Sequence, residues 1–248
     1  MDRNWSVFVH LEDSAGFLAG QRDVYPGVGL LATKDLSPGR AWTDEIVVRV
    51  AETAYAPEDL SVNVGLYDFA TGERMTIADD GMNVASLGDV ALLAHEGDVP
   101  NPVSVNFGRE LELIGYQLSE RQVRAGGALT AELFFEGQQV MERDYTVSVQ
   151  VLDPSTTQIF AQRDSWPQDG SAPTSRWEPG QVVQDMADLN FSPDTPPGEY
   201  TLQVVVYWQD DDGGFPRLQR VLPDGQLVDD FVWLTRIRVL PSGQAENP

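Results

Sequence analysis

The side chains best suited to bind a ligand form an aromatic and acidic group. Its members stand at two places in the chain: Arg163, Asp164, Trp166 and Trp177, with Arg22, Asp23 and Tyr25 at the earlier one. Aromatic faces stack on the apolar faces of sugar rings, while carboxylate and guanidinium groups hydrogen-bond to sugar hydroxyls. The group therefore predicts a carbohydrate-binding site.

The same residues also have a structural interpretation. A Trp ahead of a Pro-Gly turn, such as Trp177, commonly closes the end of a β-sandwich. A recurrent Arg-Asp pair, such as Arg163 with Asp164, commonly pins a loop. This structural role is the commoner one for such residues, and the sequence leaves both open.

Clustered carboxylates predict a second kind of site. Asp210, Asp211 and Asp212 are consecutive in the stretch QDDDGG, and ADDG at 78–81 is a shorter cluster. Calcium takes six to eight oxygen ligands and favours carboxylates on turns. Neither cluster has the alternating acidic spacing of a helix-loop-helix site, and consecutive acids on loops are usually only solvated. Calcium is the one cofactor that the sequence suggests.

Catalytic residues are poorly represented. The two histidines are His10, in a predicted strand, and His95, in a predicted linker, so a His-based triad or metal site lacks parts. A glycosidase needs only two carboxylates, but 39 acidic residues make any such pair uninformative. Phosphate-binding glycine loops are missing as well. We therefore expect a protein that is not an enzyme.

Charge and composition restrict the partners and the compartment. The 248 residues carry a formal charge of -23, and Lys34 is the single lysine, so a nucleic acid would be repelled. Cysteine is absent, so the chain has no disulfide from which to infer a compartment. The sequence contains no signal peptide and no apolar run of membrane-spanning length. We expect no nucleic-acid binding and no direct membrane insertion.

Two parts of the sequence match each other. MDRNWSVFVHLED at 1–13 aligns with MERDYTVSVQVLD at 141–153, and VNVGLY at 62–67 aligns with LQVVVY at 202–207. These ordered matches predict a duplicated module. The stretch 103–137 has no counterpart before Met1, so the first module is expected to lack its first strands. Either the chain is a fragment of a longer protein, which we favour, or the first module borrows or exposes an edge.

Alternating apolar and polar residues separated by turn-rich breaks predict many strands and little helix. The predicted strands are 5–11, 17–22, 44–50, 60–67, 73–77 and 86–94, then 103–107, 110–118, 128–135, 144–152, 158–164, 182–191, 199–208, 216–221 and 230–239. This pattern predicts an all-β protein of two tandem antiparallel β-sandwiches, immunoglobulin-like or, alternatively, jelly roll. The predicted divisions are a module at 1–97, a linker at 98–102, a complete module at 103–241 and a tail at 242–248.

Several strings together resemble a known family. They are an LxGYxL start at Leu113, Gly115, Tyr116 and Leu118, followed by DYTVSVQVLD, AQRDSWP, PTSRWEPGQVV and PPGEYTLQVVVY. They are similar to soluble C-terminal β-sandwich modules of membrane glycosyltransferase-like and other surface proteins of Chloroflexi-type bacteria. In the first module, ATKDLSPGR replaces the tryptophan-containing string, which puts a shared ligand site there in doubt.

The resemblance implies an extracytoplasmic accessory module. The family has no catalytic residues that could be assigned to positions of this chain. Our leading hypothesis is a non-catalytic accessory or interaction module of a larger surface or glycosyltransferase-like protein. Its partners would be a glycan or another protein domain, and the sequence predicts no oligomeric state. A carbohydrate-binding module is the alternative hypothesis, and a glycoside-active enzyme is the second alternative.

Overall fold

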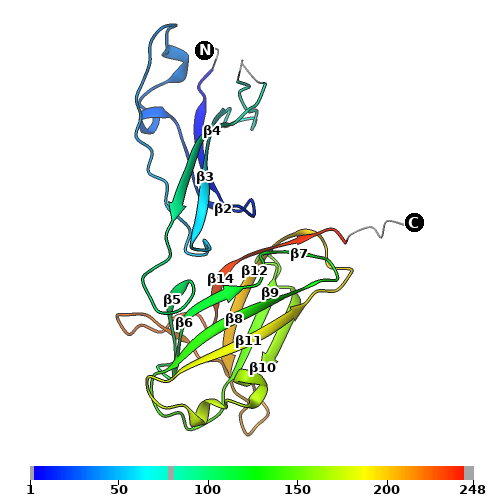
Figure 1. Cartoon of the computed structure of the whole chain (residues 1–248). Coiled ribbons are helices and arrows are strands. Elements are labelled where there is room, and N and C mark those ends of the chain that lie inside the picture. The colour runs from blue at the N-terminus through cyan, green and yellow to red at the C-terminus, as the bar shows by residue number, and fades with distance from the viewer. Residues whose placement is uncertain (1–2, 78–80, 243–248) are drawn as a thin grey trace, which may run out of the picture. The chain divides into compact units, whose positions relative to one another are not determined.

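The computed structural model describes residues 3–77 and 81–242. The chain divides into two compact units between Leu93 and Ala94 (Figure 1). Both units are built from strands, and the helices in the described ranges are four 3-10 turns: Pro26–Gly29, Thr33–Asp35, Pro167–Gly170 and Thr174–Arg176. The all-β prediction is confirmed. Within the described ranges, no helix has the length and apolar character needed to cross a membrane.

The first unit contains one antiparallel sheet. Its strands are β1 (Ser6–Glu12), β2 (Leu18–Val24), β3 (Glu58–Tyr67) and β4 (Ala85–Leu92). They are arranged in the order β2-β1-β3-β4. β1 and β3 carry valine and leucine at alternate positions, which directs these side chains to one face of the sheet.

The second unit is a two-sheet sandwich. Its strands are β5 (Pro102–Phe107), β6 (Leu111–Leu118), β7 (Gln122–Arg124), β8 (Ala128–Gly137), β9 (Thr146–Leu152), β10 (Ile159–Ser165), β11 (Val182–Asn190), β12 (Gly198–Tyr207), β13 (Arg220–Val221) and β14 (Val232–Leu240). One sheet has the order β10-β9-β12-β14-β7 and the other β11-β8-β6-β5-β13. Figure 1 shows them as two layers.

The core of the second unit lies between these layers. Val149 on β9, Val204 on β12 and Phe135 on β8 are all completely buried. Exposed or partly exposed positions alternate with buried ones along β8 and β11, as expected for sheets with one solvent-facing side. The alternation that predicted these strands therefore also determines which side of each strand faces the core.

The connections have features of an immunoglobulin-like sandwich. The chain crosses between sheets from β8 to β9 and from β11 to β12. Tyr200 lies near the start of β12, and its hydroxyl donates a hydrogen bond of 2.7 Å to the carbonyl of Pro196. This contact fixes the corner where the chain passes between the sheets, as a tyrosine corner does.

The sheet of the first unit matches four strands of the second. β2-β1-β3-β4 has the same order as β10-β9-β12-β14. Ser6 pairs with Tyr67 just as Thr146, at the aligned position, pairs with Tyr207. The register shift between β3 and β4 also recurs between β12 and β14. The sequence matches thus fall on equivalent strands with equivalent pairing.

The predicted strand at 44–50 is wrong. The aligned segment of the second unit is β11, which pairs along its whole length with β8. The described part of the first unit has no strand like β8, and only Val50 forms a bridge, with Gly20. Apolar alternation alone does not make a strand, because the backbone groups need a partner.

Smaller differences occur at short strands. In the predicted strand 73–77, only Arg74 forms a bridge, with Tyr67. In 216–221, the strand β13 is limited to Arg220 and Val221, and Arg217 forms an isolated bridge. β7 was not predicted, and it pairs in parallel with β14. These segments have too few residues for a periodic pattern to be visible.

The predicted linker packs on the second unit. The amide of Tyr116 on β6 donates a hydrogen bond of 3.1 Å to the carbonyl of Pro100, and β5 already begins at Pro102. The compact division lies a few residues earlier, after Leu93. Most of the predicted tail, residues 243–248, falls outside the described residues.

Candidate carbohydrate-binding groove

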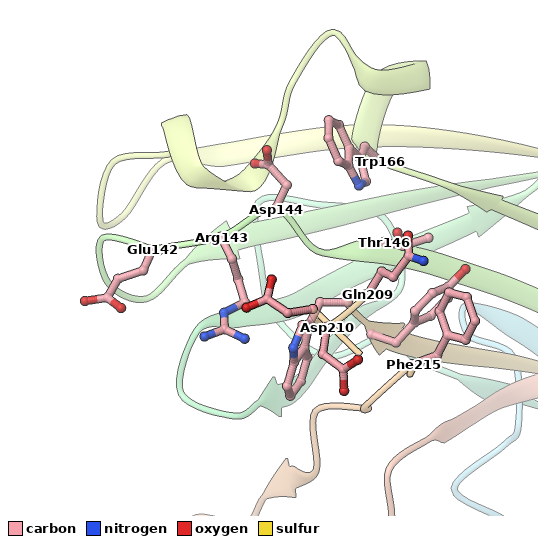
Figure 2. A pocket seen from close by; sticks show the side chains of 11 residues that line it. Glu142, Arg143, Asp144, Thr146, Trp166, Gln209, Asp210 and Phe215 are labelled. Carbon is pink, nitrogen blue, oxygen red and sulfur yellow. The ribbon is translucent and has the colours of Figure 1, made fainter. Parts of the chain in front are cut away.

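A hollow of about 690 Å³ lies at one end of the second unit (Figure 2). β9 starts there, and its antiparallel neighbours β10 and β12 end there, so the residues that flank these strand ends come together. The lining residues are Glu142, Arg143, Asp144, Thr146, Trp166, Tyr207, Trp208, Gln209, Asp210, Asp211 and Phe215.

A second hollow of about 400 Å³ adjoins the first. The two share Glu142, Arg143 and Trp208, and the second adds Glu110, Gln139, Val140, Tyr145 and Leu218. We call the two hollows together the Trp208 groove. Because its two parts share lining residues, the groove extends beyond a single hollow, which suits a ligand made of more than one ring.

Aromatic rings give the groove its apolar surface. Trp166 is 45% exposed and Phe215 is 61% exposed, so both offer ring surface to a ligand. Phe215 is held edge-on against Tyr207, with ring centroids 5.8 Å apart. Trp208 packs against Tyr145 at 5.9 Å. Rings held by neighbouring rings lose little freedom on binding, which favours affinity.

Carboxylates and one guanidinium give the groove its polar groups. Arg143 lies over the ring of Trp208 at 5.1 Å, which orients both side chains. Asp144 accepts a hydrogen bond from the amide of Ser175, and Asp210 accepts one of 2.6 Å from the amide of Gly214. Each carboxylate is thereby anchored through one oxygen, Oδ1, and its Oδ2 can accept from a sugar hydroxyl. Figure 2 shows both carboxylates around the hollow with Trp166.

Two tyrosines add neutral hydroxyl groups. Burial, and secondly the charge of Asp164, raises the pKa of Tyr207. Burial, and secondly the charge of Glu110, raises the pKa of Tyr145 to about 12. Both phenols are protonated at neutral pH and can donate or accept hydrogen bonds. The groove as a whole combines stacking faces with acceptors and donors, the combination that sugar rings require.

Three predicted site residues meet in this groove. Trp166 comes from the predicted sugar site, whereas Asp210 and Asp211 come from the predicted calcium site. Trp177, by contrast, is only 3% exposed, and its indole nitrogen donates to the carbonyl of Ala172 at 3.0 Å. The structure therefore favours the structural role of Trp177 over a ligand role, since its ring packs inside the fold and offers no face.

Arg163 has a structural role. Its guanidinium contacts Asp185 on β11 at 3.2 Å and Asp169 at 2.7 Å. Burial lowers the pKa of Arg163, but hydrogen bonding and attraction to these carboxylates outweigh burial and raise it overall. Asp185 also accepts a 2.7 Å hydrogen bond from the amide of Gln168. Arg163 thus pins the loop after β10, and its neighbour Asp164 is exposed and accepts from Gln162.

The predicted residues of the first unit lie on its surface. Arg22, Asp23 and Tyr25 are all exposed. Asp23 accepts a hydrogen bond of 3.1 Å from the hydroxyl of Tyr67, and Tyr25 lies 6.4 Å from the exposed ring of Phe69. An aromatic and acidic surface therefore recurs in the first unit.

The predicted calcium ligands are not arranged as a metal site. No group of three or more His, Asp or Glu side chains in the described parts of the chain has a geometry that would hold a metal ion. Asp210 is engaged with the turn at Gly214, and Asp212 does not line the groove. Residues 78–80, most of the other acidic cluster, lie outside the described residues.

Arg143, Trp208 and Phe215 belong to the groove but were not predicted. A signal for them existed in the sequence, because the acidic stretch 209–212 is flanked by Tyr207 and Trp208 on one side and by Phe215 on the other. An acidic stretch between aromatic residues favours sugar binding over metal binding. Arg143 required knowledge of strand pairing, since it lies far from Trp208 in sequence.

No protein-family model matches the chain, and no curated protein matches it either.

Proposed function

We propose that the second unit binds carbohydrate in the Trp208 groove without catalysing a reaction. The observation that carries this proposal is the exposed indole of Trp166 beside Phe215, Asp144 and Asp210 in one hollow. Stacking on the ring faces and hydrogen bonds to the carboxylates would hold a sugar in place, with Arg143 as the one cationic donor among the lining residues.

The charge of the groove restricts the kind of sugar. Four carboxylates line the larger hollow, from Glu142, Asp144, Asp210 and Asp211, against the single guanidinium of Arg143. An anionic glycan would be repelled by this arrangement, whereas neutral and amino sugars would not. We therefore expect neutral or basic glycans as ligands.

In this proposal the chain acts as an accessory module of a larger extracytoplasmic protein and brings it to a glycan surface. The open groove at the end of a sandwich supports this role, because it can follow a chain of sugar rings. Interaction with another protein is a second candidate function, favoured by the uncovered sheet face of the first unit that is described below.

Retention of the full chain in native gels that contain a soluble polysaccharide tests the proposal. We expect slower migration in gels with a neutral glucan or mannan, and unchanged migration in gels with alginate. Unchanged migration with every neutral glycan would overturn the proposal, and release of reducing ends would show hydrolysis instead.

A further inference from the structure

The first unit has an apolar sheet face that is partly exposed. The equivalent face within the second unit is buried. Val62 and Val64 on β3 are partly exposed, whereas the aligned Leu202 and Val204 on β12 are completely buried. The difference is larger on β4, where Val90 is 47% exposed and its counterpart Ile237 is 0% exposed.

The same contrast holds along the other strands. Val7 and Leu11 on β1 are partly exposed, while the aligned Val147 and Val151 on β9 are completely buried. Leu87, at the register shift of β4, is 69% exposed. Large aliphatic side chains exposed at several positions of one sheet face indicate an interaction site in a folded protein.

The second unit shows which strands pack on such a face. There the opposite layer is the sheet that contains β6 and β8, whose side chains Leu113, Leu133 and Phe135 are completely buried. Both strands belong to the continuous segment 102–137, which aligns with nothing in the first unit. The face that remains open in the first unit is therefore the one that this segment covers in the second.

The edge of the sheet independently indicates the same segment as the partner. β4 is the last strand of its sheet in the described part of the first unit. Its counterpart β14 pairs in parallel with β7, through Arg238 with Gln122 and Leu240 with Arg124. β7 also lies within 102–137, so one segment supplies both a face and an edge partner.

We propose that the open face of the first unit binds an amphipathic β-strand segment of the 102–137 type. This segment packs its apolar side on Val7, Val62 and Val64 and pairs one short strand in parallel with the free edge of β4. The partner is thus a polypeptide, recognised by alternating large aliphatic residues and backbone hydrogen bonds.

Charge favours this occupant over a second copy of the first unit. Residues 1–93 carry 15 acidic and six basic side chains, so two such units placed face to face repel each other. The segment 102–137 carries only five acidic and three basic side chains. A strand segment of this composition covers the face with little electrostatic opposition.

The test joins a second copy of residues 102–140 ahead of Met1 in the full chain. The junction Val140-Met1 then reproduces the natural junction Val140-Met141. Hydrogen–deuterium exchange is measured in peptides from β1, β3 and β4. We expect exchange to slow by about tenfold or more, since covered strands open less often. Peptides from β9 and β12 report in the same molecule that the second unit is folded.

A matched control carries the same extension with Leu113→Asp and Leu133→Asp in the added copy alone. It should leave the exchange of β1 and β3 unchanged. Equal slowing by both extensions, or no slowing by either, would overturn the proposal. Slowing that appears in the unextended chain as its concentration rises would also overturn it, because the occupant would then be a second copy.

Discussion

Replacing Asp185 with alanine tests whether the Arg163–Asp185 pair holds the second unit together. The Asp185 side chain is completely buried, and Arg163 is 13% exposed. The carboxylate accepts from the Arg163 guanidinium at 3.2 Å and from the Gln168 amide at 2.7 Å. Asp185→Ala removes both contacts and leaves a nearly buried guanidinium with only the exposed Asp169.

The expected loss follows from these contacts. A hydrogen bond to a charged group contributes about 1.5–3 kcal/mol to stability. Removing one partner of a buried ion pair costs about 3–5 kcal/mol, because the remaining charge stays desolvated. The remaining contact with Asp169 reduces this cost, so we expect Asp185→Ala to lower the free energy of unfolding of the second unit by about 3 kcal/mol.

Asp44 provides a matched control. It aligns with Asp185 and likewise accepts from a loop amide, that of Gly27 at 2.8 Å, but it is exposed. Asp44→Ala should therefore lower the stability of the first unit by only about 1 kcal/mol.

Native-state hydrogen exchange of β8 and β11 in the second unit measures the loss, because the slowest amides report the free energy of opening. Peptides from β1 and β3 report the first unit in the same way. A loss below about 1 kcal/mol in Asp185→Ala would refute the reasoning. So would equal losses in the two variants.

Three further predictions test other parts of the structure. The pKa of Tyr145 is raised from 10.0 to about 12 in the folded chain, so the unfolded chain loses the phenol proton at a lower pH. The contribution of Tyr145 to the free energy of unfolding is therefore fully present below pH 10 and is lost as pH rises toward 12. Between pH 10 and pH 12, the free energy of unfolding of the native chain should fall by up to about 2.7 kcal/mol more than that of Tyr145→Phe, and identical pH profiles would contradict this. Gly65→Ala should destabilise the first unit by about 1–3 kcal/mol, since a Cβ there meets the Phe8 ring and lies 2.8 Å from the Asn83 carbonyl oxygen. Gly198→Ala, whose nearest neighbour is 3.7 Å away, is the control in urea unfolding, and equal effects would argue against close packing at Gly65. Calcium should leave the melting temperature within about 1 °C of its value in chelator, and a larger rise would restore the metal site at Asp210–Asp212.

Strand positions could be predicted where a strand has partners on both sides. β9 and β12 alternate or run continuously in valine and leucine and lie in the middle of their sheet, so pattern and pairing agree. The segment 44–50 has a similar pattern but lacks the neighbour that β11 finds in β8. A single sequence records the pattern and not the neighbour, and this is why that prediction failed.

The site was predictable only in part, for a related reason. Trp166 was predicted as a sugar-binding residue, whereas Asp210 was predicted as a calcium ligand and not as part of the same site. Their meeting depends on β10 and β12 ending at the same edge of one sheet, where β9 begins with Arg143 just ahead of it. The neighbours Arg163 and Trp177 also have suitable chemistry, but both are largely buried. Arg163 holds a loop through Asp185, and the ring of Trp177 packs in the core.

Isothermal titration of a neutral oligosaccharide into the full chain tests the central claim most directly. Trp166 and Trp233 are 45% and 41% exposed, but only Trp166 lines the groove. We predict that Trp166→Ala weakens binding by about tenfold or more, which corresponds to at least about 1.4 kcal/mol, while Trp233→Ala leaves the affinity unchanged. Equal affinities for the native chain and Trp166→Ala would contradict the assignment of the Trp208 groove as a carbohydrate site.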